Sequence, residues 1–498
     1  MSGKVTLVGA GPGGRGLLTR AGAAALENAD AVVYDRLVSE DILDLVPPDA
    51  ERVSVGKENN RHPVPQDEIN ELLVRLAKAG KNTVRLKGGD CYLFGRGGEE
   101  CECLKANGVP FEVIPGVTSA LAAPAFAGIP VTHRDYCSSV HIVTAHARAG
   151  KKLEIDFESL VRLDGTLVFL MGLTALERVT DGLLSAGIDP RMPAAVIENG
   201  ARGSQSKVVA EISALSERVR AAGLQSPALI VVGRVCALSE TLDWFTPLPL
   251  HGRTVAVTRP RERAGTLADR LRALGANVIE CPCIETVERA DVSALDTALH
   301  EKWDWVALTS PAGVPALLHA LQKNGRDLRA LYGCRFAVLG AGTARALEKY
   351  GITADLCPEI YDGAHLAEAL VRAAKPGERV LLPRAAQGAD ELPRILAENG
   401  VPFADIATYD TVYRSDKAER LRELLAQNAV DTVTFTSVST VEGFVNAVGK
   451  ADFSGLTALC ISEKTAEAAR NHKMRVKIAK NATIDEMIAC LLEEYQNV

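Results

Sequence analysis

Short runs of apolar residues alternate along the chain with segments of helical periodicity. Near the start, the runs at 5–8, 31–34 and 83–86 predict strands, and the segments at 17–26 and 68–77 predict helices. Strands that alternate with helices are typical of α/β folds. The pattern therefore predicts an α/β lobe at the beginning of the chain.

A second series of the same kind follows. Its predicted strands lie at 141–144, 166–171, 194–197 and 228–232, and its predicted helices at 176–185 and 211–221. The periodicity lapses near 246–252, where Pro247 and Pro249 favour an extended connector over a helix or a central strand. We predict a first domain of two α/β lobes over residues 1–245, a linker over 246–252 and a second domain over 253–498.

The second domain repeats parts of its own sequence. The run Trp305–Ser310 resembles Thr432–Ser437, and each is followed by a Thr-Ala pair that begins a predicted helix. A strand that ends in arginine also occurs twice, as Val255–Arg259 and as Val380–Arg384. Two copies are too few for a solenoid. The second half is therefore predicted to contain two duplicated α/β lobes that flank a cleft.

Composition narrows the class of protein. A chain of 498 residues that is 47% hydrophobic is large enough for several compact lobes. The longest apolar stretches fall well short of the roughly 20 residues that cross a bilayer, so we expect a cytoplasmic protein without a membrane partner. The net charge of −7 argues against a nucleic-acid partner. The eleven cysteines lack the spacing of a metal site, and we expect no bound metal.

The segment Gly9–Gly14 has the pattern G-x-G-x-x-G directly after a predicted strand, and Asp35 ends the next strand. This combination is typical of dinucleotide-binding sites. Pro12 counts against such a site, because a proline removes an N–H group from the turn that would hold a pyrophosphate. On this loop alone, a nicotinamide cofactor and a different cofactor remain open.

The segment Arg85–Glu100 is a second glycine-rich loop at a strand end, for which a dehydrogenase has no need. It resembles the signature of the uroporphyrinogen-III C-methyltransferases, which belong to the tetrapyrrole methylases. Other segments that resemble this family, in the family's order, are Gly9–Gly13, Val33–Leu37, Val55–Lys57, Ile114–Ala120 and Gly128–Arg134. The resemblance covers nearly all of residues 1–245.

This resemblance implies a methyltransferase that uses S-adenosyl-L-methionine and acts on a porphyrinogen rich in carboxylates. By the same resemblance, the cofactor would be bound by Pro12, Gly88, Gly89, Asp90, Leu93, Thr118, Ser119, Met171 and Gly200. Asp35 would accept a proton and Lys57 would donate one. Substrate carboxylates would pair with Arg36, Arg96 and Arg134. The alternatives are a core methionine at 171, an aspartate at 35 that caps a turn, and solvated arginines.

Short motifs beyond the linker resemble uroporphyrinogen-III synthase, a family that closes hydroxymethylbilane into a ring without a cofactor. The motifs lie at 257–260, 308–311, 340–344, 382–384, 409–413 and 435–437. The resemblance implies Tyr409 as an acid. The implied substrate contacts are Arg259, Thr309, Ser310, Thr343, Arg384, Thr436 and Ser437. Alternatively, Thr309 and Thr436 only satisfy backbone groups at strand ends.

Together, the two resemblances predict a bifunctional enzyme of tetrapyrrole biosynthesis. It would make uroporphyrinogen III and then methylate it twice to precorrin-2, on the route to siroheme or cobalamin. One alternative is a methylase of another precorrin whose second half binds a tetrapyrrole without catalysis. A two-lobed ligand sensor and an NAD-dependent dehydrogenase are further alternatives. The family also implies a homodimer formed through the methyltransferase half.

Overall fold

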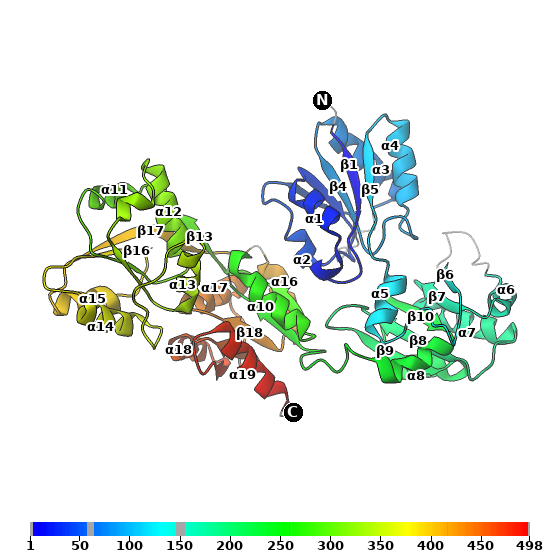
Figure 1. Ribbon diagram of the computed structural model, residues 1–498. Coiled ribbons are helices and arrows are strands. Elements are labelled where there is room, and N and C mark those ends of the chain that lie inside the picture. Colours follow the sequence, from blue (N-terminus) through cyan, green and yellow to red (C-terminus); the bar gives the residue numbers. More distant parts are fainter. Residues whose placement is uncertain (1–2, 57–63, 146–154, 260, 416, 497–498) are drawn as a thin grey trace. The chain divides into compact units, whose positions relative to one another are not determined.

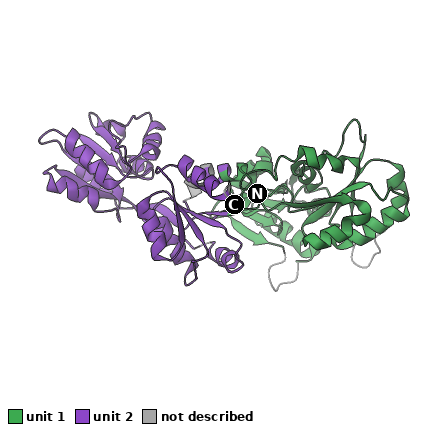
Figure 2. Ribbon diagram, turned by 90° about the horizontal axis from the view of Figure 1, so that it is seen from below, with its two compact units in different colours: residues 1–254, 271–277 green, residues 255–270, 278–498 purple. Residues whose placement is uncertain are grey.

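The computed structural model describes residues 3–56, 64–145, 155–259, 261–415 and 417–496. Contacts divide the chain into two compact units, residues 1–254 with 271–277 and residues 255–270 with 278–498 (Figure 2). Two five-stranded sheets lie in the first half of the chain and two in the second. The predicted fold class, α/β with two lobes in each half, is confirmed.

The first lobe is built on a parallel sheet of order β3-β2-β4-β1-β5 (Figure 1). Its strands are β1 Val5–Gly9, β2 Ala31–Tyr34, β3 Glu51–Ser54, β4 Thr83–Lys87 and β5 Phe111–Ile114, and its helices are α1 Arg20–Glu27, α2 Glu40–Leu43, α3 Gln66–Lys78 and α4 Gly97–Ala106. Every residue of the central strand β4 is buried. Because parallel strands end at one edge of a sheet, the loops that follow β1, β2, β4 and β5 meet at that edge.

The second lobe has the sheet order β6-β7-β10-β8-β9. Its strands are β6 Val140–Thr144, β7 Thr166–Leu170, β8 Pro193–Glu198, β9 Ser206–Glu211 and β10 Ala228–Val232, and the helices are α5 Ser119–Phe126, α6 Phe157–Arg162, α7 Leu176–Ser185, α8 Ile212–Ala222 and α9 Ser239–Leu242. Only β6 and β7 pair in parallel, and the other pairs are antiparallel. The sequence pattern missed β9 because this edge strand has no fully buried residue.

The third and fourth sheets have the orders β12-β11-β18-β19-β20 and β13-β17-β16-β14-β15. The strands of the third sheet are β11 Thr254–Val257, β12 Asn277–Glu280, β18 Thr432–Phe435, β19 Thr457–Cys460 and β20 Arg475–Ile478, with helices α10 Arg261–Ala273, α16 Ala418–Ala426, α17 Val438–Val448, α18 Glu463–Asn471 and α19 Ile484–Gln496. The strands of the fourth are β13 Ile284–Glu288, β14 Trp305–Leu308, β15 Arg335–Val338, β16 Val380–Ala385 and β17 Phe403–Tyr413, with helices α11 Ser293–Ala298, α12 Gly313–Lys323, α13 Ala341–Glu348, α14 Gly363–Ala373 and α15 Glu391–Glu398.

The strands that resemble each other in sequence occupy matching places in these two sheets. The parallel neighbours β11-β18-β19 correspond to the parallel neighbours β16-β14-β15. The copies are not consecutive, because the fourth sheet is inserted between β12 and β18 of the third. The chain leaves through β13 and returns through β17, and these two strands pair antiparallel.

The predicted extended connector at 246–252 is wrong in its local form. The segment makes successive turns, in which Leu248 N–H donates to Phe245 O at 3.1 Å and His251 N–H donates to Leu248 O at 3.0 Å. Pro249 occupies the second position of the latter turn, where its fixed φ is favourable. The prolines therefore shape turns and do not extend the chain.

Candidate functional site

Glycines at the carboxyl ends of β1, β4 and β5 lie in direct backbone contact. Gly11 N–H donates to Gly89 O at 3.1 Å, and Gly89 N–H donates to Gly11 O at 3.0 Å. A Cβ atom at Gly9 would lie 2.5 Å from Gly116 N, and one at Gly116 would lie 2.4 Å from Gly89 O. No side chain fits between these loops, so glycine is required there. The two glycine-rich loops found in the sequence form one cradle.

Asp90 ties the loop after β4 to the loop after β5. Its Oδ1 accepts N–H bonds from Tyr92 at 2.8 Å and Leu93 at 2.9 Å, and its Oδ2 accepts one from Gly116 at 3.0 Å. Asp90 therefore shapes the cradle itself. Its implied contact with the methionine portion of a cofactor stays a prediction.

The first glycine loop does not lead directly into a helix. A 3-10 turn occupies Arg15–Leu17, and α1 begins only at Arg20, with Thr19 as its N-cap. Thr19 Oγ1 accepts the N–H of Gly22 at 3.1 Å. In dinucleotide-binding folds, the N-terminus of the helix directly after the glycine loop faces the pyrophosphate. The late start of α1 therefore argues against a nicotinamide cofactor.

The remaining implied cofactor residues lie at the start of α5 and in the second lobe. Thr118 is the N-cap of α5, and the Cβ direction of Gly89 points to Ser119 N at 3.8 Å. Gly200 lies in the turn between β8 and β9, where a Cβ atom would be 2.2 Å from Ala123 Cβ. Met171 follows β7 and is 47% exposed, so the alternative of a core methionine is wrong.

Asp35 forms an ion pair with Arg85, a residue to which the sequence analysis gave no role. Arg85 Nη2 donates to Asp35 Oδ1 at 2.6 Å, and Arg85 Nε donates to Glu100 Oε1 at 3.0 Å. Lys87 Nζ donates to the same oxygen of Glu100 at 2.9 Å. The side chain of Asp35 remains 34% exposed, whereas that of Arg85 is 2% exposed. The network thus holds one face of the Asp35 carboxylate and leaves the other to solvent.

Charge balance explains how these ions are tolerated. Burial opposes the charge of Arg85, but Asp35 and Glu100 outweigh burial and raise its pKa. Two carboxylates thus face two cations, one of which is Lys87. A sequence signal existed, because Arg85 and Lys87 are charged residues inside an apolar strand. Lys57, the implied proton donor, lies outside the described residues.

The implied substrate arginines differ in their surroundings. Arg96 is the N-cap of α4 and is paired with Glu99, whose carboxylate accepts from Nε at 3.0 Å and from Nη2 at 2.6 Å. Arg36 and Arg134 are exposed. Arg202, which the sequence analysis missed, reaches from the β8–β9 turn to the loops after β1 and β2. It donates to Pro12 O at 3.3 Å and Leu37 O at 2.8 Å.

In the second half, the structure brings Ser310 and Tyr409 together. Their hydroxyl oxygens are 2.7 Å apart, and Ser310 Oγ also accepts the N–H of Gly313 at 3.2 Å. Tyr409 is 5% exposed, whereas Ser310 and Thr309 are partly exposed after β14. Ser310 therefore lies between the buried phenol and the surface of its lobe.

Arg384 and Thr343 do not fit the role of substrate contacts. Arg384 donates to Asp405 through Nε at 2.7 Å and Nη2 at 2.6 Å, and to Ala389 O through Nη1 at 2.6 Å. Its guanidinium is engaged within the lobe, which corrects the expectation that it binds a substrate carboxylate. Thr343 is 3% exposed inside α13 and is likewise out of reach.

The third sheet carries Arg259 after β11, and Thr436 with Ser437 after β18. Ser437 is the N-cap of α17 in a capping box with Thr440. Thr436 N–H donates to Thr440 Oγ1 at 3.2 Å. The backbone of Thr436 and the side chain of Ser437 thus serve the start of the helix. Their part in substrate binding stays a prediction.

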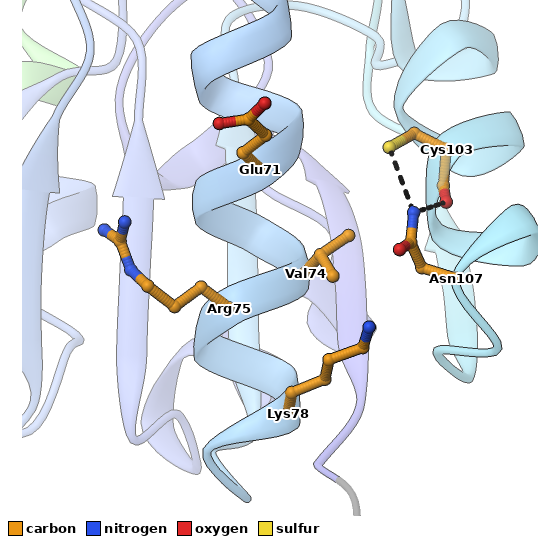
Figure 3. A pocket seen from close by; sticks show the side chains of 6 residues that line it. All are labelled: Glu71, Val74, Arg75, Lys78, Cys103 and Asn107. Atoms are coloured by element: carbon orange, nitrogen blue, oxygen red, sulfur yellow. Dashed lines mark hydrogen bonds between the residues drawn. The ribbon is translucent and has the colours of Figure 1, made fainter.

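A surface pocket of about 380 Å³ lies elsewhere on the first lobe (Figure 3). Its lining residues are Glu71, Val74, Arg75, Lys78, Cys103 and Asn107. They come from α3 and α4, and none is an implied site residue. Within the described ranges, no helix is long and apolar enough to cross a membrane. The same part of the chain contains no cluster of three or more histidine, cysteine or carboxylate residues suited to a metal ion.

Family comparisons match both halves of the chain. Residues 4–216 match the tetrapyrrole (corrin/porphyrin) methylases, and residues 265–489 match uroporphyrinogen-III synthase HemD. The porphyrin biosynthesis protein HemD of Ruminiclostridium josui is 46% identical over 493 residues, which cover 99% of this chain and 98% of that protein. The chain belongs to this family of tetrapyrrole methylases fused to a HemD-type domain. The resemblance inferred from the sequence motifs is confirmed.

Other relatives match one half each. Siroheme synthase of Salmonella typhi is 51% identical over 244 residues, which cover 49% of this chain and 52% of that protein. A uroporphyrin-III C-methyltransferase structure from Thermus thermophilus, complexed with S-adenosylhomocysteine, is 40% identical and covers 47% of this chain and 100% of its own, with a TM-score of 0.41. A Thermus thermophilus uroporphyrinogen III synthase structure is 22% identical and covers 49% and 100%, with a TM-score of 0.38.

Proposed function

We propose that this fused methylase and synthase makes uroporphyrinogen III from hydroxymethylbilane and methylates it twice to precorrin-2. The observation that carries the methylation step is the Asp35 carboxylate, held by Arg85 beside the glycine cradle. The order of the two reactions follows from their chemistry, because the product of the second half is the substrate of the first. One chain would then catalyse two consecutive steps.

The first half fits S-adenosylmethionine as its cofactor. Backbone contacts at Gly9, Gly89 and Gly116 leave an open cradle beside the N-cap Thr118. Glycine loops of this kind let a ligand approach the backbone closely. When bound, the cofactor supplies an electrophilic methyl group on a sulfonium ion. The main task of the loops is to position that group, and positioning contributes several kcal/mol to catalysis.

Asp35 is proposed to accept the proton that leaves the methylated pyrrole. Arg85 holds the carboxylate in one orientation and keeps a positive charge beside it. The partly exposed face of Asp35 is then free to meet the substrate. Lys57 is retained as the proposed proton donor on the family resemblance alone.

In the second half, we propose that Ser310 and Tyr409 act as a pair. Because Tyr409 is 5% exposed, a bilane would contact Ser310 first. Ser310 would donate a proton to the departing hydroxyl, which leaves as water, and Tyr409 would replace the proton on Ser310. The other proposed contacts are Arg259, Thr309, Thr436 and Ser437. A homodimer through the first half also remains a proposal.

The decisive experiment supplies the purified full chain with hydroxymethylbilane and S-adenosylmethionine and separates the products by chromatography. The expected product is precorrin-2, with uroporphyrinogen III accumulating when the methyl donor is omitted. Spontaneous closure gives the type I isomer, so only type I without the donor would refute the synthase activity. Type III that is never methylated would instead favour a methylase of another precorrin.

A further inference from the structure

Arg202 is held in place by the turn between β8 and β9. Asn199 and Ala201 have positive φ values of 49° and 63°, a conformation that costs energy for residues other than glycine. Gln205 Oε1 accepts the N–H of Ala201 at 2.8 Å, and Gln205 N–H donates to Arg202 O at 2.8 Å. Such a strained turn persists because its contacts fix it. The turn therefore presents Arg202 in a defined direction.

The side chain of Arg202 reaches the loop that carries Asp35. Its Nη2 donates to Leu37 O at 2.8 Å, two residues beyond Asp35 and one beyond Arg36. Its Nε donates to Pro12 O at 3.3 Å, in the first glycine loop. Two of the three guanidinium nitrogens are thus anchored on backbone oxygens. Both anchors are neutral, so they leave the positive charge of Arg202 uncompensated.

Charge near Arg202 is predominantly positive. Burial lowers the pKa of Arg202, Asp41 opposes this decrease, and Arg36 adds to it. The Asp41 carboxylate accepts the backbone N–H of Arg15 at 3.0 Å. Among the described residues, neither Arg202 nor Arg36 forms an ion pair with a carboxylate. Two guanidinium groups at one loop without a counter-ion favour a bound anion.

We propose that Arg202 and Arg36 form a carboxylate-binding subsite for the tetrapyrrole substrate of the methyltransferase. The subsite is next to Asp35, so the carboxylate that it binds belongs to the ring whose carbon loses a proton to Asp35. Arg202 is pre-oriented by its two anchors, whereas exposed Arg36 closes on the carboxylate from solvent. This inference rests on the proposed methylation of uroporphyrinogen III and specifies how one ring is selected.

The test measures methylation by the full chain at varied concentrations of each substrate, for Arg202→Gln and Arg36→Gln. Loss of a charge-assisted hydrogen bond is expected to raise KM for uroporphyrinogen III about 10- to 100-fold. KM for S-adenosylmethionine should stay within about twofold, since neither guanidinium is needed for positioning the methyl donor. The matched control is Arg218→Gln, because Arg218 is exposed on α8 and belongs to no implied site.

A purely structural role of Arg202 predicts different results. If Arg202 only joins the loops, Arg202→Gln should weaken calorimetric binding of S-adenosylhomocysteine, and Arg36→Gln should change nothing, because no contact to another side chain depends on it. Either result, or an unchanged KM for the tetrapyrrole in both variants, would overturn the subsite. A wild-type chain that does not methylate uroporphyrinogen III would refute the proposed function itself, which the wild-type assay detects separately.

A substrate series provides a second, independent measurement. Coproporphyrinogen III keeps the propionates of uroporphyrinogen III and lacks its acetates. If the subsite binds an acetate, the wild type should prefer uroporphyrinogen, and Arg36→Gln should reduce that preference about tenfold or more. An equal preference in the wild type and both variants would contradict the assignment of an acetate to the subsite.

Discussion

The Asp35 carboxylate combines a fixed orientation with a face that is open to solvent. Asp35→Asn keeps an oxygen that accepts from Arg85 and removes the ability to take a proton. We expect the methylation rate to fall about 10²- to 10⁴-fold, with little change in the affinity for S-adenosylmethionine. Initial rates and calorimetric titration measure the two quantities.

The matched control for this substitution is Asp49→Asn, because Asp49 is exposed and lies outside the site. It should leave both quantities unchanged. If cofactor affinity falls in parallel with the rate in Asp35→Asn, Asp35 belongs to the wall of the cofactor cradle and is not the proton acceptor.

Lys87 and Glu100 are a buried pair whose worth is seen when one partner is removed. The side chains are 4% and 0% exposed. Glu100→Gln leaves two buried cations with less counter-charge, and the expected loss is about 3 to 5 kcal/mol. The double variant Lys87→Met with Glu100→Gln should be less destabilised than the sum of the single variants. Additive single effects would contradict the buried pair.

The measurement for this cycle is urea denaturation of the full chain. Because the chain has several domains, a single unfolding free energy is not defined for it. The transition that S-adenosylhomocysteine shifts identifies the first half, and its midpoint is compared among the variants. These residues could not be assigned from sequence, since their roles depend on partners from β2 and α4 that only the fold brings together.

At the scale of elements, the glycine cradle is a packing requirement. Gly9→Ala places a Cβ atom 2.5 Å from Gly116 N, so the loops after β1 and β5 must separate. We expect a cost of about 1 to 3 kcal/mol, which appears as weaker binding of S-adenosylmethionine by calorimetry. The control Gly98→Ala lies in α4 with nothing within 4 Å of the new Cβ, and its binding should be unchanged. Equal affinities in both variants would refute the cradle.

Elements with strong patterns were predictable, and those that depend on tertiary contacts were not. The buried strands β1, β2 and β4 match the apolar runs in the sequence. The edge strand β9 was missed because its partly exposed residues show no clear alternation. The start of α1 was expected at 17 and lies at Arg20, because a 3-10 turn takes up Arg15–Leu17. Local backbone hydrogen bonds of this kind leave little trace in hydrophobic periodicity.

Site residues followed the same rule at a finer level. The sequence correctly grouped Gly11 and Gly89, because both follow strands of one parallel sheet. It could not show that Asp405 occupies Arg384, since an arginine that binds a ligand and one that binds a neighbouring strand look alike in sequence. Arg202 was missed because its function depends on a turn that reaches the other lobe of the same unit.

At the scale of the whole molecule, the two halves are expected to work independently within one chain. Their proposed sites lie in different compact units, and each site is built from residues of its own unit. A substitution in one site should therefore leave the other reaction intact. In the full chain with hydroxymethylbilane and S-adenosylmethionine, Asp35→Asn should accumulate uroporphyrinogen III, because synthesis continues while methylation stops.

The complementary variant affects the earlier step. Tyr409→Phe removes the hydroxyl that lies 2.7 Å from Ser310 Oγ, so the enzymatic closure should slow and spontaneous closure should raise the share of type I product. Methylation of uroporphyrinogen III supplied from outside should proceed at the wild-type rate. Chromatography of isomers and methylated products measures all three outcomes. If Tyr409→Phe slows methylation of supplied uroporphyrinogen III as well, the two sites are coupled through the fold and the halves are not independent enzymes.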